Sequence, residues 1–176
     1  MTDGDQQSAD ESSDGYIKYG ANNYISRGAE LADPNQIQLK GKTVVLKGVK
    51  IEGAVRMGRY CMLQEDVVLA PPEGVPLILR GHLVLEQGCE IKAAALGSHV
   101  FIGAGAKIGE RCILKDNIWV APNSVLGDDT VIPPFSRVEG APAKVTAELA
   151  PAVATELAEL AQDAYQAFVD SKPKVK

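Results

Sequence analysis

An aliphatic residue returns at every sixth position along most of this chain, and this period is the feature that most restricts its fold. The count starts at Leu39, gains four residues at the loop 71–76, loses one residue before Leu96 and ends at Val138. A repeat of six residues is typical of a parallel β-helix, in which three hexapeptides make one triangular coil. The pattern therefore predicts an all-β solenoid of nearly six coils. The seventeen positions, all Leu, Ile, Val or Met, are Leu39, Val45, Ile51, Met57, Leu63, Leu69, Leu79, Leu85, Ile91, Leu96, Ile102, Ile108, Leu114, Val120, Leu126, Ile132 and Val138.

The fifth position of each hexad is usually small or aliphatic, as expected where the interior of a coil narrows at a corner. The three cysteines, Cys61, Cys89 and Cys112, all occupy this position. Packing in the interior therefore accounts for them without a redox or metal-binding role. Three sparse cysteines also do not make a secreted disulfide framework, and they favour a reducing compartment.

The acidic charge of the chain is concentrated at its N-terminus. Residues 1–15 hold five carboxylates and no Lys or Arg, and they account for the whole formal net charge of −5. The remaining residues contain equal numbers of acidic and basic side chains, so composition does not suggest a surface for nucleic acid. The tail lacks apolar periodicity, and we expect it to be disordered. No run of about 18 apolar residues is present, so we expect no insertion into a membrane.

Two segments flank the repeat. Residues 16–38 form a lead-in, so the predicted β-helix with its lead-in covers 16–145. Beyond this range, apolar residues recur at steps of three and four from Leu149 to Phe168. This spacing predicts one amphipathic helix over 146–170 that packs on the β-helix, followed by a short tail, 171–176.

The outward-facing residues sort into three faces, because every third hexad returns to the same side of the coil. Two of these faces are too apolar to be left in water. The C-terminal helix can cover one of them, or lie across the edge between both. A face that stays open is a candidate interface for a protein partner. The first face carries Val84, Phe101, Trp119 and Arg137, the second carries Ile78, Ala95, Ile113 and Val131, and the third, charged face carries Glu90, Lys107 and Val125.

The two histidines are the candidate metal ligands. His82 and His99 occupy the same position of hexads three apart, so they should stack at one corner of adjacent coils. A carbonic-anhydrase-like zinc site needs three His ligands, and Asn117 follows in the same ladder, which favours a structural role over metal binding. An acyltransferase needs a His base beside its cofactor, and the loop 71–76 contains no His, Cys or Ser. We therefore assign no catalytic residue, no metal and no cofactor.

Several ordered segments resemble the dynactin subunit 5 family of hexapeptide-repeat proteins, and the resemblance spans most of 16–170. It implies a left-handed β-helix that serves as a non-enzymatic scaffold subunit of the dynactin pointed-end complex. It further implies lateral pairing with a second β-helix, dynactin subunit 6, and contact with the other pointed-end subunits. Cargo adaptors of dynein–dynactin, microtubule-based transport and a cytoplasmic, cytoskeleton-associated location follow from the same resemblance. The segments are Ser26-Arg27, Gly41-Lys42-Thr43, Val55-Arg56-Met57-Gly58-Arg59-Tyr60-Cys61, Pro71-Pro72, Leu114-Lys115-Asp116 and Pro133-Pro134-Phe135.

Departures from the family keep other functions open. The loop that begins with Pro71 and Pro72 is short, and the ending Gly140-Ala141-Pro142 resembles carbonic-anhydrase-type and acyltransferase relatives. The alternative is an inactive γ-carbonic-anhydrase-like assembly subunit, with a hexapeptide acyltransferase ranked behind it. For a scaffold subunit, the interface candidates are the first face, the second face, and Pro71 with Pro72.

Overall fold

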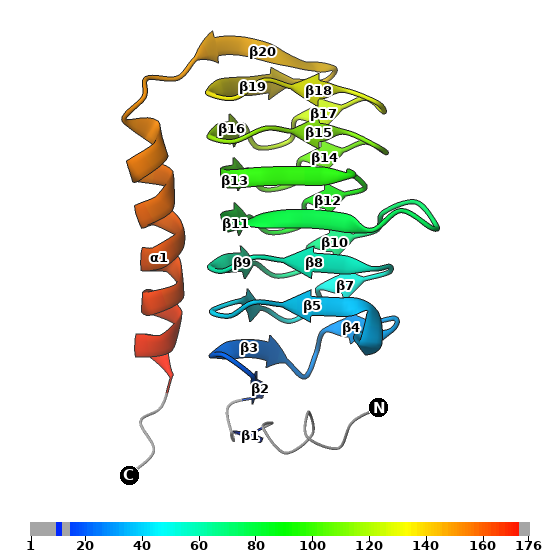
Figure 1. Cartoon of the computed structure of the whole chain (residues 1–176), viewed down its shortest axis with the longest axis vertical. Helices are drawn as coiled ribbons and strands as arrows, with labels where there is room; N and C mark the ends of the chain where they lie inside the picture. The colour runs from blue at the N-terminus through cyan, green and yellow to red at the C-terminus, as the bar shows by residue number, and fades with distance from the viewer. Residues whose placement is uncertain (1–9, 12–14, 173–176) are drawn as a thin grey trace.

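The computed structural model describes residues 10–11 and 15–172, and it shows a stack of triangular coils with one long helix along its side (Figure 1). Neighbouring coils pair through parallel strands, so each coil adds one rung to every face. The parallel β-helix of hexapeptide repeats that the sequence predicts is confirmed. The strands form three ladders, and each ladder underlies one of the three faces defined above.

The first face is built on β3 (Asn23–Ser26), β6 (Val44–Val45), β9 (Cys61–Leu63), β11 (Leu77–Leu85), β13 (Ala95–Ile102), β16 (Ile118–Val120) and β19 (Ser136–Gly140). The second is built on β5 (Ile37–Leu39), β8 (Val55–Met57), the first halves of β11 and β13, β15 (Ile113–Leu114) and β18 (Val131–Ile132). The third is built on β4 (Glu30–Leu31), β7 (Lys50–Ile51), β10 (Val68–Leu69), β12 (Glu90–Ile91), β14 (Lys107–Ile108) and β17 (Val125–Leu126). Within the part of the chain that is described, β11 and β13 are the strands that turn a corner and serve two faces.

The interior of the coils is filled by the residues that the period identifies. Sixteen of the seventeen hexad aliphatics expose 3% of their surface or less, and Leu39, at the first coil, is partly buried against the same cluster. Cys61, Cys89 and Cys112 lie in this interior as predicted. Each buried aliphatic side chain contributes roughly 1.5–3 kcal/mol of transfer free energy. The stack is therefore held together mainly by one continuous apolar column.

The two shifts in phase are also seen in the strand register. Val84 pairs with Met62 across the inserted loop, and Ile78 pairs with Ala95 in the coil that is one residue shorter. The loop 71–76 projects from the stack between β10 and β11 (Figure 1). The insertion therefore changes the outline of the molecule and leaves the ladders in register.

The solenoid begins earlier than the sequence pattern indicates. Tyr24 pairs with Val44, Leu31 with Ile51 and Ile37 with Val55, all in parallel. The predicted lead-in, 16–38, is therefore wrong from Asn23 onward, where the chain forms a first coil. A short 3₁₀ turn, η2 (Pro34–Gln36), follows an N-cap at Asp33 and adds residues to this coil. These extra residues hide the period of six.

Antiparallel strands close both ends of the stack. At the N-terminal end, β1 (Asp10–Glu11) pairs with β2 (Tyr16–Tyr19), which pairs with β3. The expectation of disorder over 1–15 is thus wrong at Asp10 and Glu11, while 1–9 and 12–14 lie outside the described residues, as does most of the predicted tail 171–176. Because a free strand edge exposes unpaired backbone groups, these terminal strands protect the two end strands of the first face's ladder, β3 and β19.

The C-terminal helix, α1 (Val153–Ser171), starts later than residue 146. Ala143–Glu148 forms β20 instead, which pairs antiparallel with β19. Without β20, β19 would be an open strand edge at the last coil. Pairing with β20 satisfies the backbone groups of β19 before the chain turns back. From there α1 runs the length of the stack toward the N-terminal end (Figure 1). Among the described residues, no helix combines the length and hydropathy that crossing a bilayer requires.

Candidate protein-interaction site

The first face lies under α1. Ala161 and Tyr165 of the helix pack with Val44, Met62 and Val84 in one buried cluster. Val84 is only 5% exposed, so it is wrong as a partner contact of the folded chain. Phe101 packs at the edge of the same cluster and is partly buried. The helix therefore covers the first face. The sequence pattern does not determine which of the two apolar faces the helix covers.

Aromatic rings position the lower half of α1. The ring of Tyr165 meets Tyr60 edge to face at 5.7 Å and lies 6.3 Å from Tyr24. Phe168 meets Tyr24 and Tyr16 in edge-on contacts at 5.5 and 4.9 Å. Burial raises the pKa of the Tyr165 hydroxyl to about 12, with smaller contributions from the neighbouring tyrosines. These directional contacts, added to apolar burial, hold the helix in one register on the stack.

Trp119 stands above the part of the first face that the helix buries best. Its ring stacks on Phe101 with centroids 5.9 Å apart and planes 6° apart. The Arg137 guanidinium lies over the other side at 4.6 Å from the ring centroid, and it bonds Glu139 at 3.1 Å. Trp119 is therefore half-buried and already flanked on both sides, which leaves less of it for a partner than its outward position suggests.

The second face is the apolar surface that stays open. Ile78, Ala95, Ile113 and Val131 follow one another in parallel register on β11, β13, β15 and β18. The first three are partly exposed, and Val131 is 57% exposed. The helix lies against the first face, so it does not shield this stripe (Figure 1). An apolar stripe four coils long that the described chain leaves uncovered is the strongest candidate for protein contact.

The same ladder extends further down than the sequence analysis assigns it. Gln38 and Arg56 occupy the outward position on β5 and β8, directly below Ile78. Arg80, beside Ile78, was missed as well. The sequence alone could have placed Gln38, Arg56 and Arg80 here. Their positions follow when the hexads are written three to a row and the count restarts after the loop 71–76. The lower end of the second face is therefore polar and basic, unlike its apolar upper end.

Pro71 and Pro72 lie beside this lower end. They are half-buried, and the loop 71–76 forms one wall of an open hollow whose other wall is the turn at Asn35 and Gln36. Arg56 and Glu52 also line this hollow. The two insertions of the solenoid lie two coils apart at the same corner, and both line this hollow, although they are far apart in sequence.

The two histidines lie one above the other on adjacent coils, as predicted, at a corner next to the helix, with their rings tilted by 57°. Their ring centroids are 5.3 Å apart, and His82 also stacks on Tyr60 at 5.1 Å. His99 Nδ1 lies 3.1 Å from the side-chain oxygen of Asn117, and His82 Nε2 lies 3.3 Å from the amide of Gln162 on α1. Burial, and then the proximity of His99, lowers the pKa of His82. The backbone of both histidines is in the left-handed conformation at the corner.

Metal-ligand geometry is not found at this corner or elsewhere in residues 15–172. No three His, Cys, Asp or Glu side chains there gather closely enough to hold an ion. The imidazoles instead contact the side chains of Asn117 and Gln162. Within the described residues, His82 and His99 are therefore not part of a group of three metal-binding side chains.

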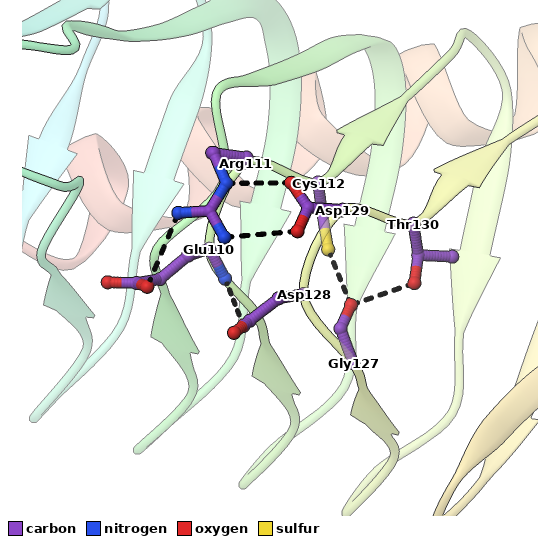
Figure 2. A network of polar contacts seen from close by, with 7 residues as sticks. All are labelled: Glu110, Arg111, Cys112, Gly127, Asp128, Asp129 and Thr130. Carbon is purple, nitrogen blue, oxygen red and sulfur yellow. Dashed lines mark hydrogen bonds and ion pairs between the residues drawn. The ribbon is translucent and has the colours of Figure 1, made fainter.

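The corner around Arg111 shows how the solvated edges of the stack are held (Figure 2). Arg111 binds both carboxylate oxygens of Asp129, eighteen residues on, at 2.7 and 3.0 Å. The Glu110 amide donates to Asp128, and the Cys112 thiol and Thr130 hydroxyl donate to the Gly127 carbonyl. The hydrogen bond from Arg111 lowers the pKa of Asp129. The contacts of Glu110, Arg111 and Cys112 join successive coils.

The interior cysteines are chemically shielded. Burial raises the pKa of the thiols of Cys61 and Cys89 to about 12, and it also raises the pKa of Cys112. A thiolate is the reactive form of cysteine. At neutral pH these side chains therefore act as small apolar groups in the column.

Comparison with solved structures identifies transferases that share this fold. A crystal structure of AntD, an N-acyltransferase from Bacillus cereus in complex with dTDP and 3-hydroxybutyryl-CoA, matches with a TM-score of 0.69 and 15% identity over 85% of this chain and 89% of that chain. A hexapeptide transferase family protein from Anaplasma phagocytophilum matches with a TM-score of 0.60 and 15% identity, over 87% of this chain and 95% of that one. At this identity the likeness establishes a shared fold and nothing about activity.

Comparison with curated proteins gives two partial relatives. Dynactin subunit 5 of Dictyostelium discoideum is 32% identical over 94 residues, which cover 47% of this chain and 48% of that protein. The bifunctional protein GlmU of Marinobacter nauticus is 29% identical over 114 residues, 64% of this chain and 24% of that protein. The matched segment thus spans less than half the length of either relative.

A family model decides between these relatives. The model for dynactin subunit 5 matches residues 9–173, which include all the coils, β20 and α1. The match includes both the coils and the C-terminal helix that packs on the first face. The family model therefore spans all the elements that leave the second face exposed. The chain belongs to the dynactin subunit 5 family.

Proposed function

We propose that this chain is a non-enzymatic assembly subunit of a dynactin-type pointed-end complex and that its second face binds a neighbouring subunit. One observation carries the proposal: in a chain that matches the family from residue 9 to 173, the helix covers the first apolar face and leaves the second uncovered. Ile78, Ala95 and Ile113 of that face are partly exposed and Val131 largely so. Surfaces of this kind commonly mark protein–protein contacts.

The partner that fits best is a second β-helix that resembles dynactin subunit 6 and lies alongside. The second face is straight, and its rungs repeat at the strand spacing of about 4.8 Å. A flat face with the same repeat can meet it over several coils, whereas a compact globular surface meets only part of it. Lateral contact also leaves both ends of the stack free for other pointed-end subunits.

Further roles belong to the same proposal. The hollow between the loop 71–76 and the turn at Asn35 offers a place for a cargo adaptor of dynein–dynactin, since Pro71, Pro72 and Arg56 line it. Such a subunit acts in microtubule-based transport and resides in the cytoplasm on the cytoskeleton. The location is consistent with three buried cysteines, which suit a reducing compartment.

The non-enzymatic assignment is supported by chemistry at the corners and in the interior. His82 contacts Gln162, His99 contacts Asn117, and the two rings lie beside each other in a tilted arrangement, so neither is set beside a nucleophile. The likeness to acyltransferases is at 15% identity and extends to the fold alone. A test is direct: purified protein should contain less than stoichiometric zinc, hydrate no carbon dioxide and transfer no acyl group from coenzyme A thioesters. Zinc bound tightly at His82 and His99 would favour the carbonic-anhydrase-like alternative.

A matched set of variants tests the interface. Ile113→Asp and Val131→Asp place a charge on the second face, and Val125→Asp places the same charge on the third face, where Val125 is 39% exposed. We expect affinity purification of the tagged full chain to lose the other pointed-end subunits with the first two variants and to keep them with the third. Circular dichroism and thermal midpoints verify that all three fold. Equal recovery of the subunits with all variants would contradict the assignment of the second face.

A further inference from the structure

Cations and glycines alternate along one edge of the second face. Each of these residues directly follows an interior aliphatic of that face, and the aliphatics Leu39, Met57, Leu79, Leu96 and Leu114 pair in register from coil to coil. The edge therefore presents one such residue per coil. In order along the stack, they are Lys40, Gly58, Arg80, Gly97 and Lys115.

Each glycine lies at the floor of a hollow between two cations. The lower hollow is lined by Lys40, Gly58 and Arg80 together with Arg56 and Ile78. The upper hollow is lined by Arg80, Gly97, Lys115, Asp116, Ala95 and Ile113. The coils approach so closely here that a Cβ on Gly58 would collide with the Arg80 backbone, and one on Gly97 with the Lys115 backbone. The absence of side chains at these two positions allows the coils to approach closely beneath the hollows.

The charges around the hollows are unbalanced. Lys40, Arg56, Arg80 and Lys115 are exposed, and within residues 15–172 none of them forms a hydrogen bond or ion pair with a carboxylate. One carboxylate lines a hollow, Asp116, and one of its oxygens already accepts the Ser98 amide at 2.8 Å. On the third face, by contrast, Lys107 lies 3.7 Å from Glu90. The second face is thus locally positive in a chain whose net charge is −5.

We propose that the partner of the second face inserts carboxylate side chains into the two hollows, one on each side of Arg80, and lays apolar residues on Ile78 and Ile113. The hollows are two coils apart, a separation of about 10 Å. A β-helix that lies parallel alongside repeats at the same spacing, so Asp or Glu on alternate coils of its facing surface matches both hollows. Charge-assisted hydrogen bonds to Arg80 then become strong because the apolar contact excludes water. This inference rests on the proposed function and adds the chemistry by which the partner is recognised.

The experiment uses the full chain with dynactin subunit 6 of the same organism as the probe. Arg80→Glu reverses the central charge, and Lys50→Glu is the matched control on the third face, where Lys50 is exposed and forms no ion pair in the described chain. We expect Arg80→Glu to weaken binding at least about tenfold at physiological salt, and Lys50→Glu to change it less than twofold. Wild-type affinity should fall as salt rises, and Arg80→Glu should flatten this dependence.

Zero-length cross-linking supplies a second readout. A carbodiimide joins a lysine amine only to a carboxylate in contact with it, so mass spectrometry of the wild-type complex should find Lys40 and Lys115 joined to Asp or Glu of the partner. A complex that forms with unchanged affinity for Arg80→Glu, or with both lysines uncoupled, overturns the carboxylate proposal and leaves the proposed function standing. Failure of the wild-type chain to bind the probe overturns both. Retention on phosphatidylserine vesicles that Arg80→Glu abolishes would overturn it in favour of a membrane-facing surface.

Discussion

The hydroxyl of Tyr165 donates a hydrogen bond to the backbone carbonyl of Asn22 at 3.0 Å, joining the C-terminal helix to the corner that opens the first coil. The same helix packs on Met62 and Val84, in later coils. In a solenoid, each repeat otherwise contacts only its neighbours. The helix therefore links coils that do not touch one another, and its loss should loosen the stack at the N-terminal end.

Removing this hydroxyl should cost a measurable amount of stability. We expect Tyr165→Phe to lower the free energy of unfolding by about 1 kcal/mol, the usual net value of one hydrogen bond. Tyr165→Ala also removes the ring contacts with Tyr60 and Tyr24 and should cost about 3–5 kcal/mol. Urea denaturation measures both, with the exposed Glu159→Ala as control at less than about 0.5 kcal/mol. A Tyr165→Ala protein as stable as Tyr165→Phe would show that the rings contribute little.

Acidification should weaken the histidine corner. The pKa of His82 is lowered in the folded chain, so between this value and about 6.5 the unfolded state binds more protons. Stability is then fully present above about pH 6.5 and is lost as pH falls through the lowered pKa. His82→Asn should remove this component of the pH dependence, because Asn117 already occupies the same left-handed corner at φ 63°. Thermal midpoints between pH 7.5 and 5 measure the difference.

Titration of the carboxylates does not interfere with this measurement. Hydrogen bonds, from Arg111 to Asp129 and from Thr146 and then Arg137 to Glu139, lower the pKa of both acids. The stability they contribute is present above their ordinary pKa values, about 3.9 and 4.3, and is lost only at more acidic pH. Parallel pH curves for wild type and His82→Asn between pH 5 and 7.5 would therefore count against a role for His82.

The cysteines should resist alkylation in the folded protein. Since the pKa of Cys61 and of Cys89 is about 12 and all three thiols are buried, almost no thiolate is available at pH 8. We expect iodoacetamide to label none of the three within an hour at 25 °C, and to label all three in 6 M guanidinium chloride. Labelling is followed by intact-mass measurement. Rapid labelling of Cys61 or Cys89 without denaturant would mean that the coils open far more often than the packing suggests.

Two glycines in equivalent hexad positions should respond differently to alanine. Both follow an interior aliphatic, and neither has a positive φ. A Cβ at Gly58 meets the backbone of Arg80, whereas a Cβ at Gly127 meets nothing within 4 Å. We expect Gly58→Ala to destabilise the chain by about 2 kcal/mol or more and Gly127→Ala to change stability by less than about 0.5 kcal/mol. Similar urea midpoints for the two variants would contradict the close approach of the coils at Gly58.

Much of the fold follows from counting along the chain. The period of six identifies the interior residues, and it also predicts that Phe101 lies beside Trp119 and His82 beside His99, which the structure confirms. The count reaches only Leu39 of the first coil, because η2 adds residues between Leu31 and Ile37 and only the pairing of these strands with β7 and β8 reveals their phase. It also misses β20, since Ala143–Glu148 becomes a strand by pairing with β19.

By itself, the sequence determined a coil of hexapeptides with two apolar faces and one charged face, because a side chain that repeats every six residues can avoid water only inside such a coil. Only the tertiary structure decided which apolar face receives the helix. The first face continues downward through Met62 and Val44 to Tyr24, so the C-terminal half of α1 finds apolar and aromatic contacts there. On the second face the same helix would bury Arg56 and Gln38, and desolvating an unpaired charge is costly. The helix therefore covers the first face, and the second face remains open.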